Sequence, residues 1–236
     1  MVNKILKDVK DLQNSEINKV VIKRANEFSS FKNKSDKEWF SELCYCILTA
    51  NSKAKTALAI QKQLGPEGFL NYSQDKLVEI IKNNKHRFHN NKAKFIVEAR
   101  KYKNIKNIIQ GIAKPNDYAS HSDAREFIVR NINGLSYKEA SHFLRNVGYF
   151  DLAILDRHIY NLMIDYKLIK EKPKSITKKK YLMIEKKFNS FAYKAKIPPG
   201  VFDLYVWYIQ TGEVLKWKKQ KKRLLIFIRK SLIKKY

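Results

Sequence analysis

Residues 132–140 read Ile132-Asn133-Gly134-Leu135-Ser136-Tyr137-Lys138-Glu139-Ala140. Ser136 and Glu139 have the spacing of a capping box, in which each side chain bonds a free backbone N–H of the first helical turn. This spacing predicts a helix that begins at Ser136. Gly134 permits a tight turn just before it. We therefore expect two short helices joined by a glycine-bearing turn, at about residues 124–148.

Helical spacing recurs on both sides of this pair, and no run of alternating apolar and polar residues is present. Four of the expected helices have both ends assigned and cover 35–50, 92–102, 181–191 and 201–210. Four more are located by one end: one is opened by Ser73, one is capped by Ser122-Asp123, one is ended by Gly148 and one is capped by Asp156. Gly111 to Ser122 and Lys170 to Lys180 are expected to be loops. These patterns predict an all-α protein of about ten short helices without an internal repeat.

The composition is that of a folded and strongly basic protein. Of the 236 residues, 44% are hydrophobic, enough to build a core, and Lys and Arg exceed Asp and Glu by 49 to 22, for a net charge of +27. Such an excess points to a polyanionic partner, most simply nucleic acid. Most of the cations are Lys, which attracts phosphate as a point charge and is less suited to reading base edges.

Metal and membrane roles are not indicated. Cys44 and Cys46 are two residues apart, no Cys/His set has zinc spacing, and two cysteines cannot ligate a four-cysteine cluster. The pair is therefore expected to be two buried thiols in a reducing compartment. No stretch approaches the ~20 apolar residues of a membrane helix, and the mixed-charge N-terminus does not look like a signal peptide. The sequence predicts a soluble intracellular protein.

The turn at Gly134 is also suited to bind a ligand, because a helix N-terminus presents backbone N–H groups that the helix itself does not use. Gly134 and Ser136 are therefore candidate contacts to a DNA phosphate, a contact that reads no base sequence. Pairs of helices joined by a turn are common, so this spacing alone leaves a purely structural role open for both residues.

The residues of this pair resemble the helix-hairpin-helix of DNA glycosylases, in which a lysine four residues after the first hairpin glycine is the nucleophile. Lys138 stands at that position. Eighteen residues further on, Ile154-Leu155-Asp156-Arg157-His158-Ile159 resembles the family's aspartate segment. The chain is similar to the archaeal type 2 8-oxoguanine DNA glycosylase/lyase branch over most of residues 30–216. The segments that carry this similarity are 42–51, 86–88, 134–159 and 203–208.

The resemblance implies that Lys138 and Asp156 are catalytic. A neutral lysine amine attacks the anomeric carbon and forms a Schiff base, which permits strand cleavage by β-elimination. Lys138 lies in the first turn of its helix, where the positive end of the helix dipole favours the neutral amine. Asp156 is suited to stabilise positive charge on the sugar and to help move protons. Taken alone, Lys138 would be interpreted as a surface lysine and Asp156 as a plain helix cap.

The resemblance also implies residues that hold the DNA and the damaged base. The expected base pocket consists of Phe88, Trp207, Asp203 and Lys216, and the expected DNA contacts are Asn51, Arg87, Gly134 and Ser136. Phe88 and Trp207 are candidates to stack on an extruded base, with core packing as the alternative. Asn51 is expected to fill the space that the base leaves, and an ordinary helix-end asparagine fits its position as well.

Two positions depart from the family's pattern. Ser136 stands where the hairpin usually carries glycine, and because serine takes a positive φ less readily, phosphate approach there is expected to differ. Family chains characteristically end with a lysine whose terminal carboxylate helps to recognise the oxidised base. Here twenty residues follow Lys216, so a peptide carbonyl, a weaker acceptor, stands in that place. We divide the chain into a glycosylase domain, 1–216, and a basic C-terminal extension, 217–236.

We expect two helical lobes with a DNA-binding cleft between them and the N-terminal helix packed on the C-terminal half. The expected enzyme is a monomer, cytoplasmic and chromosome-associated, that removes 8-oxoguanine from double-stranded DNA and cleaves the abasic strand. No cofactor is expected to be required, although the wider superfamily implies a backbone-bound monovalent cation at the hairpin.

Three other functions remain open at this point. One is a lyase glycosylase of the endonuclease III type, whose usual cluster this chain cannot ligate. Another is a helix-hairpin-helix module that binds DNA without chemistry, and the third is a basic helical protein that binds DNA or RNA. The spacing of Lys138 and Asp156 argues against the non-catalytic module.

Overall fold

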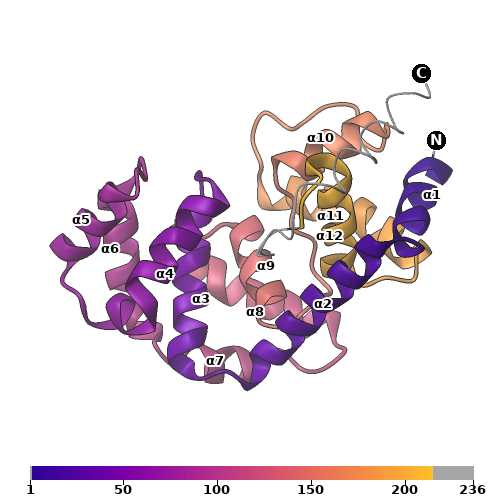
Figure 1. Cartoon of the computed structure of the whole chain (residues 1–236). Helices are drawn as coiled ribbons and strands as arrows, with labels where there is room; N and C mark the ends of the chain where they lie inside the picture. Colours follow the sequence, from indigo (N-terminus) through magenta and orange to yellow (C-terminus); the bar gives the residue numbers. More distant parts are fainter. Residues whose placement is uncertain (1, 215–236) are drawn as a thin grey trace.

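The computed structural model describes residues 2–214, and every regular element in that range is helical (Figure 1). The α-helices of this range are α1 (Val2–Gln13), α2 (Glu16–Ser30), α3 (Asp36–Thr49), α4 (Ala54–Asn71), α5 (Gln74–Asn83), α6 (His89–Ala99), α7 (Ile105–Ile112), α8 (Tyr118–Asn131), α9 (Tyr137–Asn146), α10 (Arg157–Asp165), α11 (Lys178–Lys194) and α12 (Pro199–Thr211). Short 3-10 turns follow α2 and α6. The all-α prediction is confirmed, and α2, α4 and α7 are helices that the sequence patterns did not single out.

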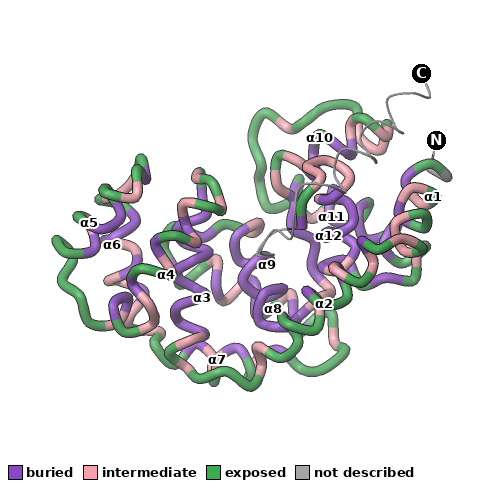
Figure 2. Tube along the Cα trace, in the orientation of Figure 1, coloured by how far each residue is buried: buried purple, intermediate pink, exposed green. Residues whose placement is uncertain are grey.

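The helices form two hydrophobic cores, as the prediction of two lobes requires. One core lies among α3 to α9 and includes the buried Trp39 and Phe143. The other joins the two ends of the chain, because α1 and α2 pack with α10, α11 and α12 around Val9, Phe188 and Phe202. Buried residues are concentrated in α3, α9 and α12, and the connecting segments are mostly exposed (Figure 2). The predicted packing of the N-terminal helix on the C-terminal half is confirmed.

Helices α8 and α9 form the predicted hairpin, which lies between the two groups of helices (Figure 1). Gly134 has φ +84 in the turn, and a Cβ at this position would lie 2.4 Å from the ring of Phe95, so backbone and space both require glycine. Ser136 and Glu139 form the predicted capping box. Ser136 has φ −100, so the expected conflict between serine and a positive φ does not arise.

The predicted start of α8 is wrong. We expected a loop from Gly111 to Ser122 and a cap at Ser122-Asp123, but the Asp117 side chain caps the helix by accepting from the backbone N–H of Ala119 at 3.0 Å. The reason lies in contacts to the preceding loop. The Ser120 hydroxyl and the His121 ring are bonded to the backbone of Lys114, which fixes an earlier first turn.

The other predicted helices agree with the structure to within a few residues at each end. Ser35, Ser73 and Asp156 cap α3, α5 and α10 as predicted. Helix α11 is three residues longer at each end than the predicted 181–191, because Thr177 caps it inside the expected loop. Cys44 and Cys46 are free and buried on α3.

Candidate active site at the hairpin

Lys138 is the second residue of α9 and remains accessible, with 24% of its side-chain surface exposed. Its Nζ lies 3.4 Å from Oε1 of Glu139. Burial opposes ionisation of the Glu139 carboxyl, but the charge of Lys138 and hydrogen bonds from Ser136 outweigh burial and lower the pKa of Glu139. The capping box therefore also supplies a carboxylate beside the Lys138 amine.

Asp156 is fixed at the start of α10 by its own capping bonds. Its Oδ1 accepts from the backbone N–H groups of His158 at 2.8 Å and Ile159 at 2.9 Å. Within the described range no donor bonds the second oxygen, Oδ2, and the residue is half-buried. The cap thus orients the carboxylate and leaves one oxygen available for a ligand.

Asp203, on α12, forms a group with Lys138 and Asp156 and is only 5% exposed. The pKa of Asp203 is raised to about 7, chiefly by burial and in smaller part by the negative charge of Asp156, against the opposing charges of Arg145 and Lys138. Asp203 thus lies within electrostatic reach of both Lys138 and Asp156. The structure therefore brings together three residues that are far apart in the sequence.

A buried polar network holds Asp203 and connects the two cores. Arg145 Nη1 donates to Asp203 Oδ2 at 3.3 Å, and Arg145 Nε donates to Asn146 Oδ1 at 2.8 Å. Asn146 Nδ2 in turn donates to Glu42 Oε1 at 2.6 Å. These contacts run from α3 through α9 to α12. Sequence reasoning did not assign roles to Arg145 and Asn146, although both lie within the segment that carries the family resemblance.

Lys92 is a second residue near the hairpin that sequence reasoning missed. It lies on α6 and is only 4% exposed. Its pKa is lowered to about 8, chiefly by burial and in smaller part by the charge of Lys138, while Glu139 acts in the opposite direction. The available signal was the helical spacing of Lys92 with Phe95 and Ala99, which places a cationic residue on a face that packs inward.

The aromatic residues predicted to stack on a base are both partly accessible. Phe88 directly precedes α6, and the guanidinium carbon of Arg87, itself exposed, lies 4.4 Å from its ring centroid. Trp207, on α12, meets the ring of His158 edge-on, with 4.7 Å between centroids. Helix α6 lies on the left of Figure 1 and α12 to the right of α9, and no ring contact joins Phe88 to Trp207 in the part of the chain that the structure describes. Their role in stacking stays a prediction.

The remaining residues predicted to contact DNA differ in how exposed they are and in whether their polar groups are already hydrogen-bonded. Asn51 is exposed two residues after the end of α3 and has φ +59, a conformation that asparagine tolerates better than most residues. The backbone N–H of Ser136 donates to Glu139 at 3.2 Å, so that group is already bonded within the chain. Phosphate contacts from Asn51, Arg87, Gly134 and Ser136 stay predictions. Lys216 and the extension 217–236 lie outside the described residues.

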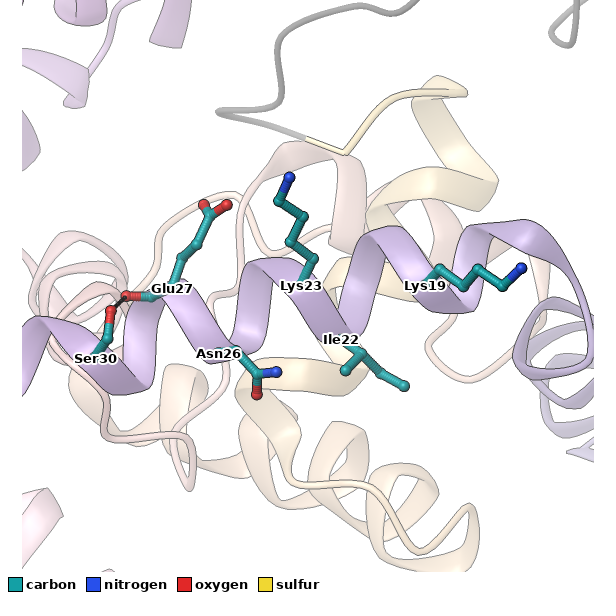
Figure 3. Close-up of a pocket in the computed structure, with 6 residues that line it drawn as sticks. All are labelled: Lys19, Ile22, Lys23, Asn26, Glu27 and Ser30. Carbon is teal, nitrogen blue, oxygen red and sulfur yellow. Dashed lines mark hydrogen bonds between the residues drawn. The ribbon is translucent and has the colours of Figure 1, made fainter.

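Two surface grooves of the structure lie away from this group. One groove of about 600 Å³ follows α2, and Figure 3 shows its side chains projecting from successive turns of that helix. It contains none of the predicted site residues, and the predicted cleft between the lobes stays a prediction. In residues 2–214 no group of three or more His, Cys, Asp or Glu side chains could hold a metal ion. None of the described helices is long and apolar enough to cross a membrane.

Comparison with known proteins gives a consistent result. A family model described as 8-oxoguanine DNA glycosylase matches residues 21–197. The 8-oxoguanine DNA glycosylase/AP lyase of Methanocaldococcus jannaschii is 48% identical over 90% of this chain and 99% of its own length. A crystal structure of the 8-oxoguanine glycosylase/lyase of that organism contains a 15mer DNA with 8-oxoguanine. Its chain matches this one with a TM-score of 0.84 and 47% identity, over 90% of this chain and 100% of that chain.

A second solved structure extends the similarity beyond that organism. The 8-oxoguanine DNA glycosylase of Thermotoga maritima has a TM-score of 0.81 and 38% identity, and covers 91% of this chain and 99% of its own. The family model spans the hairpin and includes Lys138 and Asp156, whereas Asp203 lies beyond its last matched residue, 197. On this basis the chain belongs to the 8-oxoguanine DNA glycosylase family.

Proposed function

We propose that this chain removes 8-oxoguanine from double-stranded DNA and then cleaves the strand at the abasic site, with Lys138 as the nucleophile and Asp156 as its catalytic partner. The observation that carries the proposal is the meeting of an accessible lysine at a helix N-terminus with two carboxyl groups, those of Asp156 and Asp203. The relatives named 8-oxoguanine DNA glycosylase/AP lyase favour this activity over the endonuclease III type and over a non-catalytic module.

In the first step the neutral amine of Lys138 attacks C1′ of the damaged nucleotide. As the Nζ–C1′ bond forms, the bond from C1′ to the base breaks, and one proton passes from the amine to the departing base. Positive charge develops on the sugar during this step, and the fixed carboxylate of Asp156 is suited to stabilise it. The capping bonds to Oδ1 hold Asp156 in place and leave Oδ2 available to the reacting sugar.

In the second step the C1′–O4′ bond of the linked sugar breaks, O4′ takes up a proton from water, and the lone pair of Nζ forms the C=N bond of a protonated Schiff base at C1′. The iminium acidifies C2′, so that loss of the C2′ proton forms a double bond to C3′ and expels the 3′ phosphate. Strand cleavage therefore needs no further nucleophile once Lys138 is linked to the sugar. This chemistry explains how one lysine serves both excision and strand cleavage.

The other predicted contacts belong to this proposal. Asn51 would fill the gap left by the extruded base, and Phe88 and Trp207 would stack on the base. A monovalent cation at the hairpin would rest on backbone carbonyls, of which that of Ile132 accepts only a 3.4 Å bond from Leu135 and retains acceptor capacity. We also propose that the enzyme acts as a monomer on chromosomal DNA in the cytoplasm, with elution volume in gel filtration as the check on its oligomeric state.

Borohydride trapping on a duplex with a single 8-oxoguanine tests the assignment of the nucleophile. The wild-type protein is expected to form a stable adduct with the DNA, and Lys138→Gln to form none. Asp156→Asn is expected to slow excision at least 100-fold while lesion binding is retained, because asparagine preserves the helix cap but carries no charge.

Lys179→Gln is the matched control for the nucleophile. Lys179 is also the second residue of a helix, α11, and is exposed, so its substitution removes the same charge from the same helical position. This variant is expected to form the adduct at the wild-type rate. An adduct of undiminished yield in Lys138→Gln would refute Lys138 as the nucleophile.

A further inference from the structure

The segment that leads into Asp156 is buried but has no regular secondary structure. Residues 153–156 lie between α9 and α10, and Ala153, Ile154 and Leu155 are at most 5% exposed. Neither a helix nor a strand therefore supplies hydrogen-bond partners for the backbone of this segment, and buried backbone groups need partners from elsewhere. Those partners decide where the Asp156 carboxylate lies.

Two side chains of α11 supply such partners. The Tyr181 hydroxyl donates to the carbonyl oxygen of Ala153 at 2.8 Å and accepts from the backbone N–H of Leu155 at 3.4 Å. The backbone N–H of Ala153 donates to Oε1 of Glu185 at 3.1 Å. Both backbone groups of Ala153 and the N–H of Leu155 are thus bonded to α11, directly before the carboxylate of Asp156.

The ring of Tyr181 also contacts the hairpin. It packs against the ring of Tyr137, the residue before Lys138, with 5.5 Å between the ring centroids. The Tyr137 hydroxyl in turn donates to Oε1 of Glu126 on α8 at 2.7 Å, which holds that ring on the first hairpin helix. Tyr181 therefore contacts both the start of α9 and the segment before α10.

A buried ion pair connects Glu185 to both hairpin helices. Arg125, on α8, donates from Nη1 to Glu185 Oε1 at 2.6 Å and from Nη2 to Oε2 at 2.9 Å. Nη1 also donates at 3.2 Å to the hydroxyl of Ser141, one turn after Lys138 on α9. Such a bidentate pair has a well-defined geometry. Glu185 therefore holds Ala153 at a fixed place relative to the hairpin.

We propose that Tyr181 and Glu185 are positioning residues for the reaction, which hold the segment before Asp156 against the hairpin and so set the position of its carboxylate relative to Lys138. The inference rests on the proposed roles of Lys138 and Asp156. Both positioning side chains are buried, so they act through Asp156 and do not touch the DNA. Because a displacement of about 1 Å can slow a reaction by about 100-fold, loss of one of these bonds is expected to slow excision.

Tyr181→Phe is the principal test, because it removes the hydroxyl and keeps the ring against Tyr137. We expect excision of 8-oxoguanine in single turnover to be about 10-fold slower, with the dissociation constant for lesion DNA changed by less than about twofold. Borohydride trapping on a duplex with a preformed abasic site is expected to stay within about twofold of wild type, because that reaction uses Lys138 without breaking a bond from C1′ to a base.

A double variant tests whether Tyr181 acts through Asp156. If it does, Asp156→Asn/Tyr181→Phe is expected to excise no more slowly than Asp156→Asn alone, because the position of this side chain matters little once its charge is absent. Independent effects would multiply, and a further loss of about 10-fold in the double variant would overturn the proposal.

Glu185→Asp tests the second positioning residue. It keeps the charge opposite Arg125, but its shorter side chain does not reach both Arg125 and the backbone of Ala153 as glutamate does. The same pattern is expected, with slower excision and trapping at a preformed abasic site close to wild type. Circular dichroism of each variant verifies that it is folded, and Tyr181→Phe tests the proposal by itself if Glu185→Asp is not.

Tyr205→Phe is the matched control. Tyr205 is 3% exposed in the same core as Tyr181, and its hydroxyl donates to the side chain of Asn18 on α2. The variant removes an equally buried hydroxyl that makes no bond to residues 153–155, so excision is expected at the wild-type rate.

Excision at the wild-type rate by Tyr181→Phe would overturn the proposal. Equal losses in excision and in abasic-site trapping would do so too, since they indicate a merely structural role. An adduct of undiminished yield in Lys138→Gln, or wild-type excision by Asp156→Asn, would instead refute the proposed function itself.

Discussion

At the residue scale, the burial of Asp203 makes the stability of the protein depend on pH. Burial raises its pKa from 3.8 to about 7, so between these values the folded state binds a proton that the unfolded state does not. The contribution of Asp203 to the free energy of unfolding therefore falls as pH rises from about 4 to 7. In Asp203→Asn this dependence disappears. We therefore compare the free energy of unfolding of Asp203→Asn with that of the wild type by urea denaturation. The difference, variant minus wild type, is expected to be about 3 kcal/mol larger at pH 8 than at pH 4.

Asp123→Asn is the control for this measurement, because Asp123 is an exposed carboxyl on α8. Its stability relative to wild type is expected to change by less than about 0.5 kcal/mol over the same range. A constant difference between wild type and Asp203→Asn across the range would show that Asp203 does not carry the raised pKa.

Phe88 and Trp207 provide a test of base stacking. Stacking requires an extruded base, so Phe88→Ala and Trp207→Ala are expected to weaken binding to lesion DNA about 5- to 100-fold and binding to undamaged duplex less than about twofold. Both affinities are measurable by fluorescence anisotropy at one salt concentration. Tyr193→Ala, which removes an exposed aromatic residue on α11, should change neither. Equal losses on both duplexes would assign Phe88 and Trp207 to packing.

The sequence was sufficient to single out Lys138 and Asp156 as candidates only because both lie in recognisable local segments. The capping box fixes Lys138 in a first turn, and Asp156 is itself a helix cap, so local signals place each of them. Lys92 has no such signal, because its burial depends on how α6 packs against a turn about 40 residues away. The coupling of Asp203 to Asp156 likewise arises only when α12 returns to the hairpin.

At the scale of the element, the hairpin turn depends on Gly134. An alanine there would adopt a left-handed conformation and collide with the ring of Phe95. We expect Gly134→Ala to lower the free energy of unfolding by about 2–4 kcal/mol. Gly111→Ala is the control, since Gly111 lies within α7 with open space around it, and alanine there should raise stability by about 0.5–1 kcal/mol. Equal stabilities of the two variants in denaturant titrations would contradict this account of the turn.

The presence of most helices was predictable from local sequence, whereas some helix boundaries depend on contacts of the folded chain. Where a capping residue has no competitor, as at Ser35 and Ser73, the predicted boundary is confirmed. Before α8 two good caps, Asp117 and Ser122-Asp123, lie within two turns of each other, and local propensity does not separate them. The choice is made by bonds of Ser120 and His121 to Lys114, which are contacts of the folded chain.

At the scale of the whole molecule, the site lies where the two cores meet. Helix α9 contributes Lys138 at one end and, through Arg145 and Asn146, bonds to α12 and α3 at the other. Asp156 and Asp203 come from the core that contains both chain ends, whereas α9 packs in the other. The proposed catalytic group is therefore assembled only when both cores are folded against α9, which is why sequence spacing alone could not supply its geometry.

The net charge of +27 makes DNA binding by the whole molecule depend on salt. The logarithm of the binding constant should fall with the logarithm of salt concentration, with a slope of about −0.9 for each phosphate neutralised. Residues 217–236 hold nine of the positive charges and no acidic residue. Truncation after Lys216 is therefore expected to flatten the slope measured with undamaged duplex.

Excision of 8-oxoguanine should survive this truncation, because Lys138, Asp156 and Asp203 all lie within the described residues. Truncation also turns the Lys216 carbonyl into a carboxylate, a stronger hydrogen-bond acceptor, so preference for 8-oxoguanine over guanine is expected to sharpen. Single-turnover excision and binding measured from 50 to 200 mM salt separate the two effects. Phosphate attraction alone changes affinity and leaves the chemical step intact when the enzyme is saturating. If the truncated protein keeps its circular dichroism spectrum but no longer excises 8-oxoguanine, the extension therefore belongs to the active site.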